Sequence, residues 1–379
     1  MIQCPMSLIL LDKFNTLTSQ IVANSELIHV IIGPRQVGKT TVAHYFCKNS
    51  NLKYQFFSAD GEVSRPKEWL QVLWNQANDE NIELLVIDEI QKVENWSETI
   101  KKVWDERKRK IYLIILGSSS LEIHKGLSES LAGRFFLHPF MHWSYEESIK
   151  LKPMSLEQYL TFGGYPGSYQ FINHLYDWLH FIQHSIIEPV IGKDILSLAH
   201  VKSPALFRQC FDLVCSYSSR EISYTKLLGS LQDKGNTDLI KHYIELFEAA
   251  FLIKSLQKFS TKEFKKRSSS PKIISMCPAL YSITKDAQLD QDDLGKSFEN
   301  MIGALLVKFP GKLYYWREGN AEVDYVYQFG KNIHAIEVKW GKSRSTKGLE
   351  KFLTHFPNAK THLVTPENYQ RLTIDFLHS

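Results

Sequence analysis

The run Leu27-Ile28-His29-Val30-Ile31-Ile32-Gly33-Pro34-Arg35-Gln36-Val37-Gly38-Lys39-Thr40-Thr41 decides the fold of the first part of this 379-residue chain. Residues 33–40 fit the pattern G-x-x-x-x-G-K-[ST]. The apolar residues 27–32 before them predict a buried strand, and residues 40–46 after them predict a helix. Strand, glycine-rich loop and helix in this order are the setting that the pattern requires, so the sequence predicts a phosphate-binding loop.

Each residue type in this loop suits a nucleotide phosphate. The glycines allow backbone N–H groups to wrap the phosphate, where the helix N-terminus adds partial positive charge. We expect Lys39 to reach the β- and γ-phosphates and the Thr40 hydroxyl to ligate Mg²⁺. The predicted ATP-binding residues are Gly33, Pro34, Arg35, Gln36, Val37, Gly38, Lys39, Thr40 and Thr41.

A second apolar run, residues 84–87, ends in Asp88 and Glu89. Because ligands of open α/β sheets bind at the carboxyl ends of strands, we expect both acids beside the phosphates. Asp88 is predicted to hold Mg²⁺, directly or through water, and Glu89 to polarise the attacking water as a general base. The alternative, a polar strand end without a role, is disfavoured by the phosphate loop.

Two further residues are candidates for catalysis. The strand-like residues 111–116 lead into Gly117-Ser118-Ser119-Ser120, where Ser118, with Ser119 close behind, is predicted to sense the γ-phosphate or to orient water. Arg134, in Leu131-Ala132-Gly133-Arg134, is a candidate to reach a γ-phosphate in its own or a neighbouring subunit. A surface salt bridge accounts for this arginine equally well.

These motifs resemble those of prokaryotic AAA-type ATPases with a conserved C-terminal domain of unknown function. The resemblance is carried by GPRQVGKTT at 33–41, IDEIQ at 87–91, GSSS at 117–120 and LAGRFF at 131–136. Gly163-Gly164-Tyr165-Pro166 and Lys193-Asp194-Ile195 are similar to the start of that second domain. The resemblance implies that Ser118 is the first sensor and Arg134 an arginine finger. A finger acting between subunits implies a homo-oligomer.

Charged residues gather again near the C-terminus. Asp324 lies on an alternating strand, and Glu337 and Lys339 lie on the next one, where residues i and i+2 share a face. A hairpin through 328–332 places Asp324 beside them. Two carboxylates and a lysine suit metal-assisted phosphodiester cleavage, with Glu299 of the helical stretch 297–307 as a further ligand. A satisfied ion-pair cluster and a DNA-binding surface that never cuts are the alternatives.

This arrangement resembles the PD-(D/E)-x-K nuclease superfamily. The resemblance implies a core of Asp324, Glu337 and Lys339, with Glu299 in the leading helix. Between the two sites, residues 224–232 and 238–250 read as two helices followed by a strand at 251–256, an order that favours a winged helix. An element that only packs domains together is the alternative reading of this stretch.

The predicted fold class is therefore α/β, with three domains. They are a P-loop parallel-sheet ATPase domain (1–148), a helical domain with a winged-helix-like element (149–257) and an α/β restriction-endonuclease-like domain (258–379). The basic residues near 262–270 predict an exposed loop. Five cysteines without a C-x-x-C pair indicate neither a disulfide framework nor a zinc site.

Composition limits the partners. The net charge of +4 permits nucleic-acid contact without arguing for it. No run of apolar residues has the length of a membrane span and no signal sequence precedes the domain, so we expect a cytoplasmic protein with no membrane partner. The leading hypothesis is an ATPase that uses ATP and Mg²⁺ and couples hydrolysis to a DNA-associated C-terminal domain. An ATP-dependent protein-binding switch and an ATP-regulated nuclease are the alternatives.

Overall fold

A computed structural model of the protein describes residues 5–61, 63–117, 126–127, 129–196, 201, 203–231, 236–260, 269–341 and 346–378. The chain forms two compact units. The first unit comprises Met1–His142, Glu146–Pro153 and Glu188–His200, and the second comprises Trp143–Tyr145, Met154–Ile187 and Val201–Ser379. The division into three domains at residues 148 and 257 stays a prediction.

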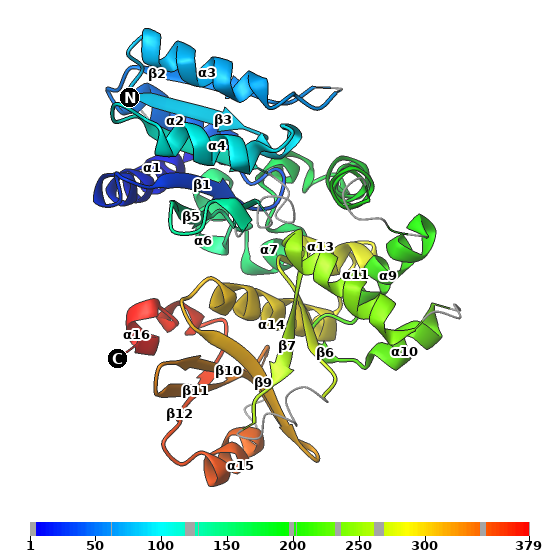
Figure 1. The fold of residues 1–379 in the computed structure, drawn as a ribbon. Coiled ribbons are helices and arrows are strands. Elements are labelled where there is room, and N and C mark those ends of the chain that lie inside the picture. Colours follow the sequence, from blue (N-terminus) through cyan, green and yellow to red (C-terminus); the bar gives the residue numbers. More distant parts are fainter. Residues whose placement is uncertain are drawn as a thin grey trace. The chain divides into compact units, whose positions relative to one another are not determined.

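The first unit is built on a five-stranded sheet with the order β2-β3-β4-β1-β5 (Figure 1). Every neighbouring pair of strands in it is parallel, which confirms the predicted parallel sheet. The strands are β1 (Ile28–Ile32), β2 (Tyr54–Ser58), β3 (Leu84–Asp88), β4 (Tyr112–Gly117) and β5 (Phe135–Pro139). The helices are α1 (Pro5–Ala23), α2 (Lys39–Asn49), α3 (Glu68–Asp79), α4 (Trp96–Asp105) and α6 (Tyr145–Leu151), with 3₁₀ residues Ile90–Lys92 and π-helical residues Pro189–Ile195.

The apolar runs become central strands because both faces of this sheet are covered. All five residues of β1 and of β3 are buried, so each strand must bury successive side chains on opposite faces. On one face, Leu17 and Ile21 of α1 and Val42 and Phe46 of α2 pack against a core that includes Ile31. Neither α1 nor β5 was predicted from the sequence.

The second unit begins with short helical segments packed around aromatic side chains. Its first helices are α7 (Leu156–Phe162) and α8 (Leu175–His180), followed by π-helical residues Phe181–Ile187. Trp178 is fully buried and meets Phe162 edge to face, with 5.1 Å between ring centroids. Trp178 and Phe162 therefore contribute to a core in this part of the chain, whereas Tyr176 is exposed.

The elements that follow are α9 (Pro204–Ser216), β6 (Arg220–Glu221), α10 (Tyr224–Ser230), α11 (Thr237–Ala249), β7 (Ile253–Lys258) and β8 (Lys272–Ser275). Helices α10 and α11 lie where the sequence placed two helices, and β7 follows as the expected strand. The Asn236 side chain caps α11 by accepting from Leu239 N, which sets where this helix begins. Strand β8, which pairs antiparallel with β7 and with β6, was not predicted.

The rest of the second unit consists of α13 (Pro278–Ser282), α14 (Gln291–Val307), β9 (Lys312–Glu318), β10 (Ala321–Phe329), β11 (Asn332–Val338), α15 (Lys347–His355), β12 (Lys360–Val364) and α16 (Ile374–His378), with 3₁₀ residues at Pro166–Phe171, Ile283–Lys285 and Tyr369–Arg371. One seven-stranded sheet joins these strands to the preceding ones, in the order β12-β11-β10-β9-β7-β8-β6 (Figure 1). The predicted hairpin is confirmed, because β10 and β11 pair antiparallel up to Phe329 and Asn332.

Two helices lie on this sheet at its β9-β10-β11 part. Phe352 of α15 packs in a cluster with Trp316, Val323 and Ala335. On α14, an added Cβ at Gly303 would lie 2.5 Å from the Tyr325 hydroxyl, so the glycine permits a close approach of helix and sheet. The predicted exposed loop near 262–270 lies largely outside the described residues.

Among the described helices, none combines the length and the apolar character that a membrane crossing requires.

Replacing Phe207 by Ala should destabilise the second unit. The Phe207 side chain is fully buried on α9, and its ring centroid lies 4.8 Å from that of Tyr243 and 4.6 Å from that of Phe247. The cavity should lower the free energy of unfolding by about 3–5 kcal/mol, measured by urea denaturation. Tyr176→Ala is the control, because this ring is 78% exposed, and its effect should stay within about 0.5 kcal/mol. Equal effects of the two substitutions would contradict the packing described.

Candidate functional site

The loop between β1 and α2 turns tightly against the end of β5. A Cβ added at Gly33, whose φ is 155°, would stand 1.9 Å from the Phe140 carbonyl oxygen. The end of β5 is held beside β1 by a hydrogen bond of 2.7 Å from Phe140 N to Ile32 O. Gly38, with φ of 90°, takes the left-handed conformation just before α2. Space requires glycine at the first position, and backbone conformation favours it at the second.

Lys39 is held inside this loop. Its side chain is buried, and Nζ donates to Gly33 O at 2.9 Å and to Pro34 O at 2.7 Å. The ammonium therefore lies against the loop backbone at the first residue of α2, where the helix N-terminus adds positive potential. This combination suits an anion such as a nucleotide phosphate.

A hydrogen bond joins the two predicted Mg²⁺ ligands. Thr40 Oγ1 donates to Asp88 Oδ2 at 2.8 Å, and Asp88 Oδ1 accepts from Glu89 N at 2.9 Å. Burial raises the pKa of Asp88, while the hydrogen bond from Thr40 lowers it. A hydroxyl and a buried carboxylate side by side are the oxygen ligands that Mg²⁺ prefers, so the residues present fit this cation.

Glu89 follows Asp88 in a left-handed backbone conformation, with φ of 53° and ψ of 43°. This conformation is uncommon for a residue other than glycine, and such strain concentrates at functional sites. Its carboxylate is half-buried and accepts a hydrogen bond from the side-chain amide of Gln91. Glu89 is thus oriented by a neighbouring amide that the sequence reasoning did not single out.

Of the other two predicted catalytic residues, the structure describes Arg134 alone. Ser118 lies outside the described residues. Arg134 O accepts from Ile28 N, so this arginine lies at the amino end of β1, while the phosphate loop follows its carboxyl end. The strand separates these ends by about 13 Å at 3.3 Å per residue. The guanidinium of Arg134 instead holds both carboxylate oxygens of Asp105, at 2.8 and 2.9 Å.

In the second unit, the predicted C-terminal residues do gather. Lys339 Nζ lies 2.6 Å from Glu337 Oε1, and Asp324 Oδ2 accepts from Val338 N at 2.8 Å. Burial raises the pKa of Glu337, and the neighbouring charge of Asp324 raises it further. Glu299 reaches the same place from α14.

A lysine that sequence reasoning missed lies among these acids. Lys272 of β8 is fully buried, and its Nζ lies 2.7 Å from Glu299 Oε1, 3.3 Å from Glu322 Oε1 and 3.5 Å from Asp324 Oδ1. We call Glu299, Glu322, Asp324 and Glu337 the acidic cluster. Burial lowers the pKa of Lys272, but the carboxylates, Glu299 foremost, hold it well above its usual value. No spacing rule links a lysine in the run 271–275 to acids so far along the chain.

The acidic cluster does not fit a metal ion as it stands. Among the residues that the structure describes, no group of three or more His, Cys, Asp or Glu side chains is arranged to hold a metal. The lysine that contacts three of the four carboxylates supplies the physical reason.

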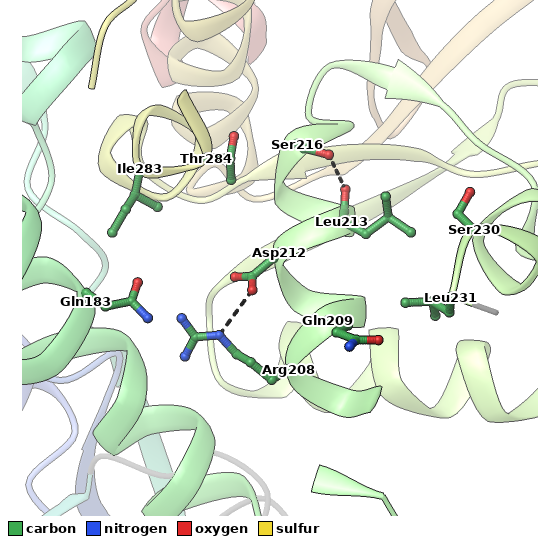
Figure 2. A pocket seen from close by; sticks show the side chains of 10 residues that line it. All are labelled: Gln183, Arg208, Gln209, Asp212, Leu213, Ser216, Ser230, Leu231, Ile283 and Thr284. Atoms are coloured by element: carbon green, nitrogen blue, oxygen red, sulfur yellow. Dashed lines mark hydrogen bonds and ion pairs between the residues drawn. The ribbon is translucent and has the colours of Figure 1, made fainter. Parts of the chain in front are cut away.

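A pocket of about 570 Å³ lies elsewhere in the second unit (Figure 2). Its charged side chains, Arg208 and Asp212 of α9, approach each other to 3.3 Å, which leaves the pocket without a net charge from this pair. No motif in the sequence predicted it. The remaining lining is Gln183, Gln209, Leu213, Ser216, Ser230, Leu231, Ile283 and Thr284.

Three protein families match successive parts of the chain. Two of them are domains of unknown function, matching residues 154–290 and 294–376. The chain is also similar to uncharacterised proteins. One from Methanocaldococcus jannaschii is 23% identical over 92% of this chain and 84% of its own length. One from Mycobacterium tuberculosis is 23% identical over 90% of this chain and 77% of its own length.

Among solved structures, a RuvB variant of Thermotoga maritima covers 64% of this chain and 88% of its own, with a TM-score of 0.33 and 15% identity. A structure describing katanin self-assembly covers 59% and 78%, with a TM-score of 0.28 and 16% identity. A signal-transduction ATPase with numerous domains from Pyrococcus horikoshii covers 76% and 44%, with a TM-score of 0.26 and 11% identity.

The third family match falls on the part of the chain that holds the phosphate loop. Residues 25–160 match an AAA domain, a span that contains β1 to β5 together with Lys39, Asp88 and Glu89. This match supports an AAA-type ATPase that binds ATP.

Proposed function

We propose that the protein is a Mg²⁺-dependent ATPase that uses hydrolysis at the loop of residues 33–41 to control a DNA-associated second unit. One observation carries the first half of this proposal, namely the 2.8 Å hydrogen bond between Thr40 and Asp88 beside a buried Lys39. The bond brings a phosphate-binding loop and a metal-binding strand end into one site. The AAA domain match to residues 25–160 supports the same reading.

The side chains have distinct roles in this proposal. The loop backbone and Lys39 bind and orient the phosphates, and the positive charge of Lys39 stabilises the negative charge that develops on the transferred group. Thr40 and Asp88 would hold Mg²⁺, which supplies further neutralisation of phosphate charge when bound. Lys39 and Thr40 belong to the first turn of α2, so their positions are set by a rigid element.

Glu89 is the proposed general base. Its carboxylate lies one residue beyond Asp88, on a backbone turn that leaves β3, and Gln91 restrains it through a hydrogen bond. A carboxylate in this position accepts a proton from water as the water attacks the phosphate. Arg134 lies at the opposite end of β1, so we propose a finger role for it only toward a neighbouring subunit in an oligomer.

The proposed DNA association rests on the order of elements in the second unit. The series α9, β6, α10, α11, β7 and β8 runs helix, strand, two helices and a hairpin, which is the order of a winged helix. Lys226 on α10 and Lys241 on α11 are exposed, as phosphate contacts require. A switch that binds another protein remains the second candidate, because the same elements also suit packing between domains.

Replacing Lys39 by Ala should abolish ATP turnover. Loss of the buried ammonium removes a charge from the phosphate site, so we expect kcat to fall about 100-fold or more. The measurement is phosphate release at saturating Mg²⁺ and ATP. Lys48→Ala is the matched control, since Lys48 is an exposed lysine at the other end of the same helix, and it should turn over at the wild-type rate. Wild-type turnover by Lys39→Ala would overturn the proposed site.

Replacing Glu89 by Gln should separate binding from hydrolysis. The amide keeps the shape of the side chain but cannot accept a proton, so turnover should fall on the order of 100-fold while ATP still binds. Calorimetric titration with ATP measures binding, and phosphate release measures turnover. Glu98→Gln, at an exposed glutamate of α4, should change neither. If Glu89→Gln hydrolysed ATP normally, another group would have to be the base.

DNA should stimulate ATP turnover if the second unit is DNA-associated. We would measure phosphate release with single-stranded, duplex and branched DNA, using Lys39→Ala to subtract contaminating activity. Stimulation that falls as salt rises is the expected result, because phosphate contacts release counterions. Turnover that no DNA changes would instead favour the protein-binding switch.

A further inference from the structure

Lys272 is a charged side chain that the proposed ATP hydrolysis does not use. It is fully buried on β8, which pairs with β7 and β6 in the seven-stranded sheet. A buried ammonium is costly unless it is paired and hydrogen-bonded. Lys272 meets this condition within the acidic cluster, through an ion pair with Glu299 and hydrogen bonds to Glu322 and Asp324.

The three carboxylates reach this lysine from different elements. Glu299 comes from α14, and Glu322 and Asp324 come from β10. Asp324 contributes both a carboxylate oxygen at 3.5 Å and its backbone oxygen at 3.4 Å. Oxygen atoms from two elements thus surround one positive charge. That charge is the ammonium of Lys272.

One carboxylate oxygen of the cluster is left unused by the neighbouring lysines. The side chain of Glu337 is 11% exposed, and its Oε2 atom has no hydrogen-bond partner among the described residues. Burying such an oxygen carries a desolvation cost that the existing partner of Oε1, Lys339, does not relieve. A divalent cation would use this oxygen.

We infer that Lys272 occupies the cation position of the acidic cluster and excludes divalent metal ions from it, so that removing this ammonium converts the cluster into a site for Mg²⁺ or Mn²⁺. The ammonium takes the space between the carboxylates and repels a second positive charge at a few ångströms. Without it, the acids carry an excess of negative charge that a divalent cation balances through oxygen ligands. The acidic cluster is accordingly closed to divalent cations while the ammonium of Lys272 occupies it.

The test is Mn²⁺ binding by the full chain without nucleotide, read by electron paramagnetic resonance. Lys272→Met replaces the ammonium by a neutral side chain of similar length, and it should bind one further Mn²⁺, at a cluster where the wild-type chain binds none. Its melting temperature should rise with Mn²⁺ concentration, because binding stabilises the folded state. Adding Asp324→Asn to this variant should remove both effects, which assigns the ion to the cluster rather than to Asp88.

Two further variants of Lys272 complete the experiment, one as a control and one as a second test variant. Lys272→Arg retains the positive charge and should gain no Mn²⁺. Lys272→Gln, which retains a hydrogen-bond donor without the charge, repeats the test if Lys272→Met fails to fold. Mn²⁺ bound by the wild type and lost in Asp324→Asn would overturn the inference. A folded Lys272→Met or Lys272→Gln without a new Mn²⁺ site would overturn it as well. Since neither readout involves ATP, these results are independent of the proposed hydrolysis.

Discussion

The parallel pairing of β1 with β4 on one side and β5 on the other is the constraint on which the nucleotide site depends. Parallel strands all end at one edge of the sheet, so the loop after β1 and the acids at the end of β3 meet there although β4 lies between the two strands. The hydrogen bond from Thr40 to Asp88 links the helix that follows β1 to the end of β3. The approach of Phe140 O to Gly33 shows that β5 limits the loop from its other side, where no side chain fits.

The two charged sites of the chain use opposite electrostatic solutions. In the first unit, Asp88 is buried beside a hydroxyl, and its carboxylate has a raised pKa because burial disfavours the charged form. Such a group gains from a cation that comes from outside. In the second unit, the ammonium of Lys272 supplies the positive charge, and the three carboxylates around it are paired with it. Similar carboxylates therefore lie beside a hydroxyl in one unit and around a buried ammonium in the other.

The sequence-based predictions are most accurate where a residue's conformation depends on its neighbours along the chain. The predicted strands at 27–32 and 84–87 match β1 and β3 within one residue, because each is a largely apolar run with a glutamate just before it and a glycine or an acid just after it. Strands β5 and β8 were missed, since their apolar runs, Phe-Phe-Leu in one and Ile-Ile in the other, are too short to predict a strand. Arg134 shows a further limit. Its motif left open a phosphate contact in its own or a neighbouring subunit, and the pairing of β5 with β1 puts it at the end of the strand away from the loop of its own subunit.

The sequence by itself determined the phosphate loop, the acids that follow β3 and the hairpin that brings Asp324 to Glu337. These features need only short-range geometry, namely a strand, a turn and a helix start, or two strands joined by a tight turn. The tertiary structure alone decided what surrounds Asp324 and Glu337, because Lys272 reaches them across a sheet that joins β8 to β10 through β7 and β9. Whether carboxylates face a metal ion or an ammonium depends on this long-range pairing, which no spacing along the chain encodes.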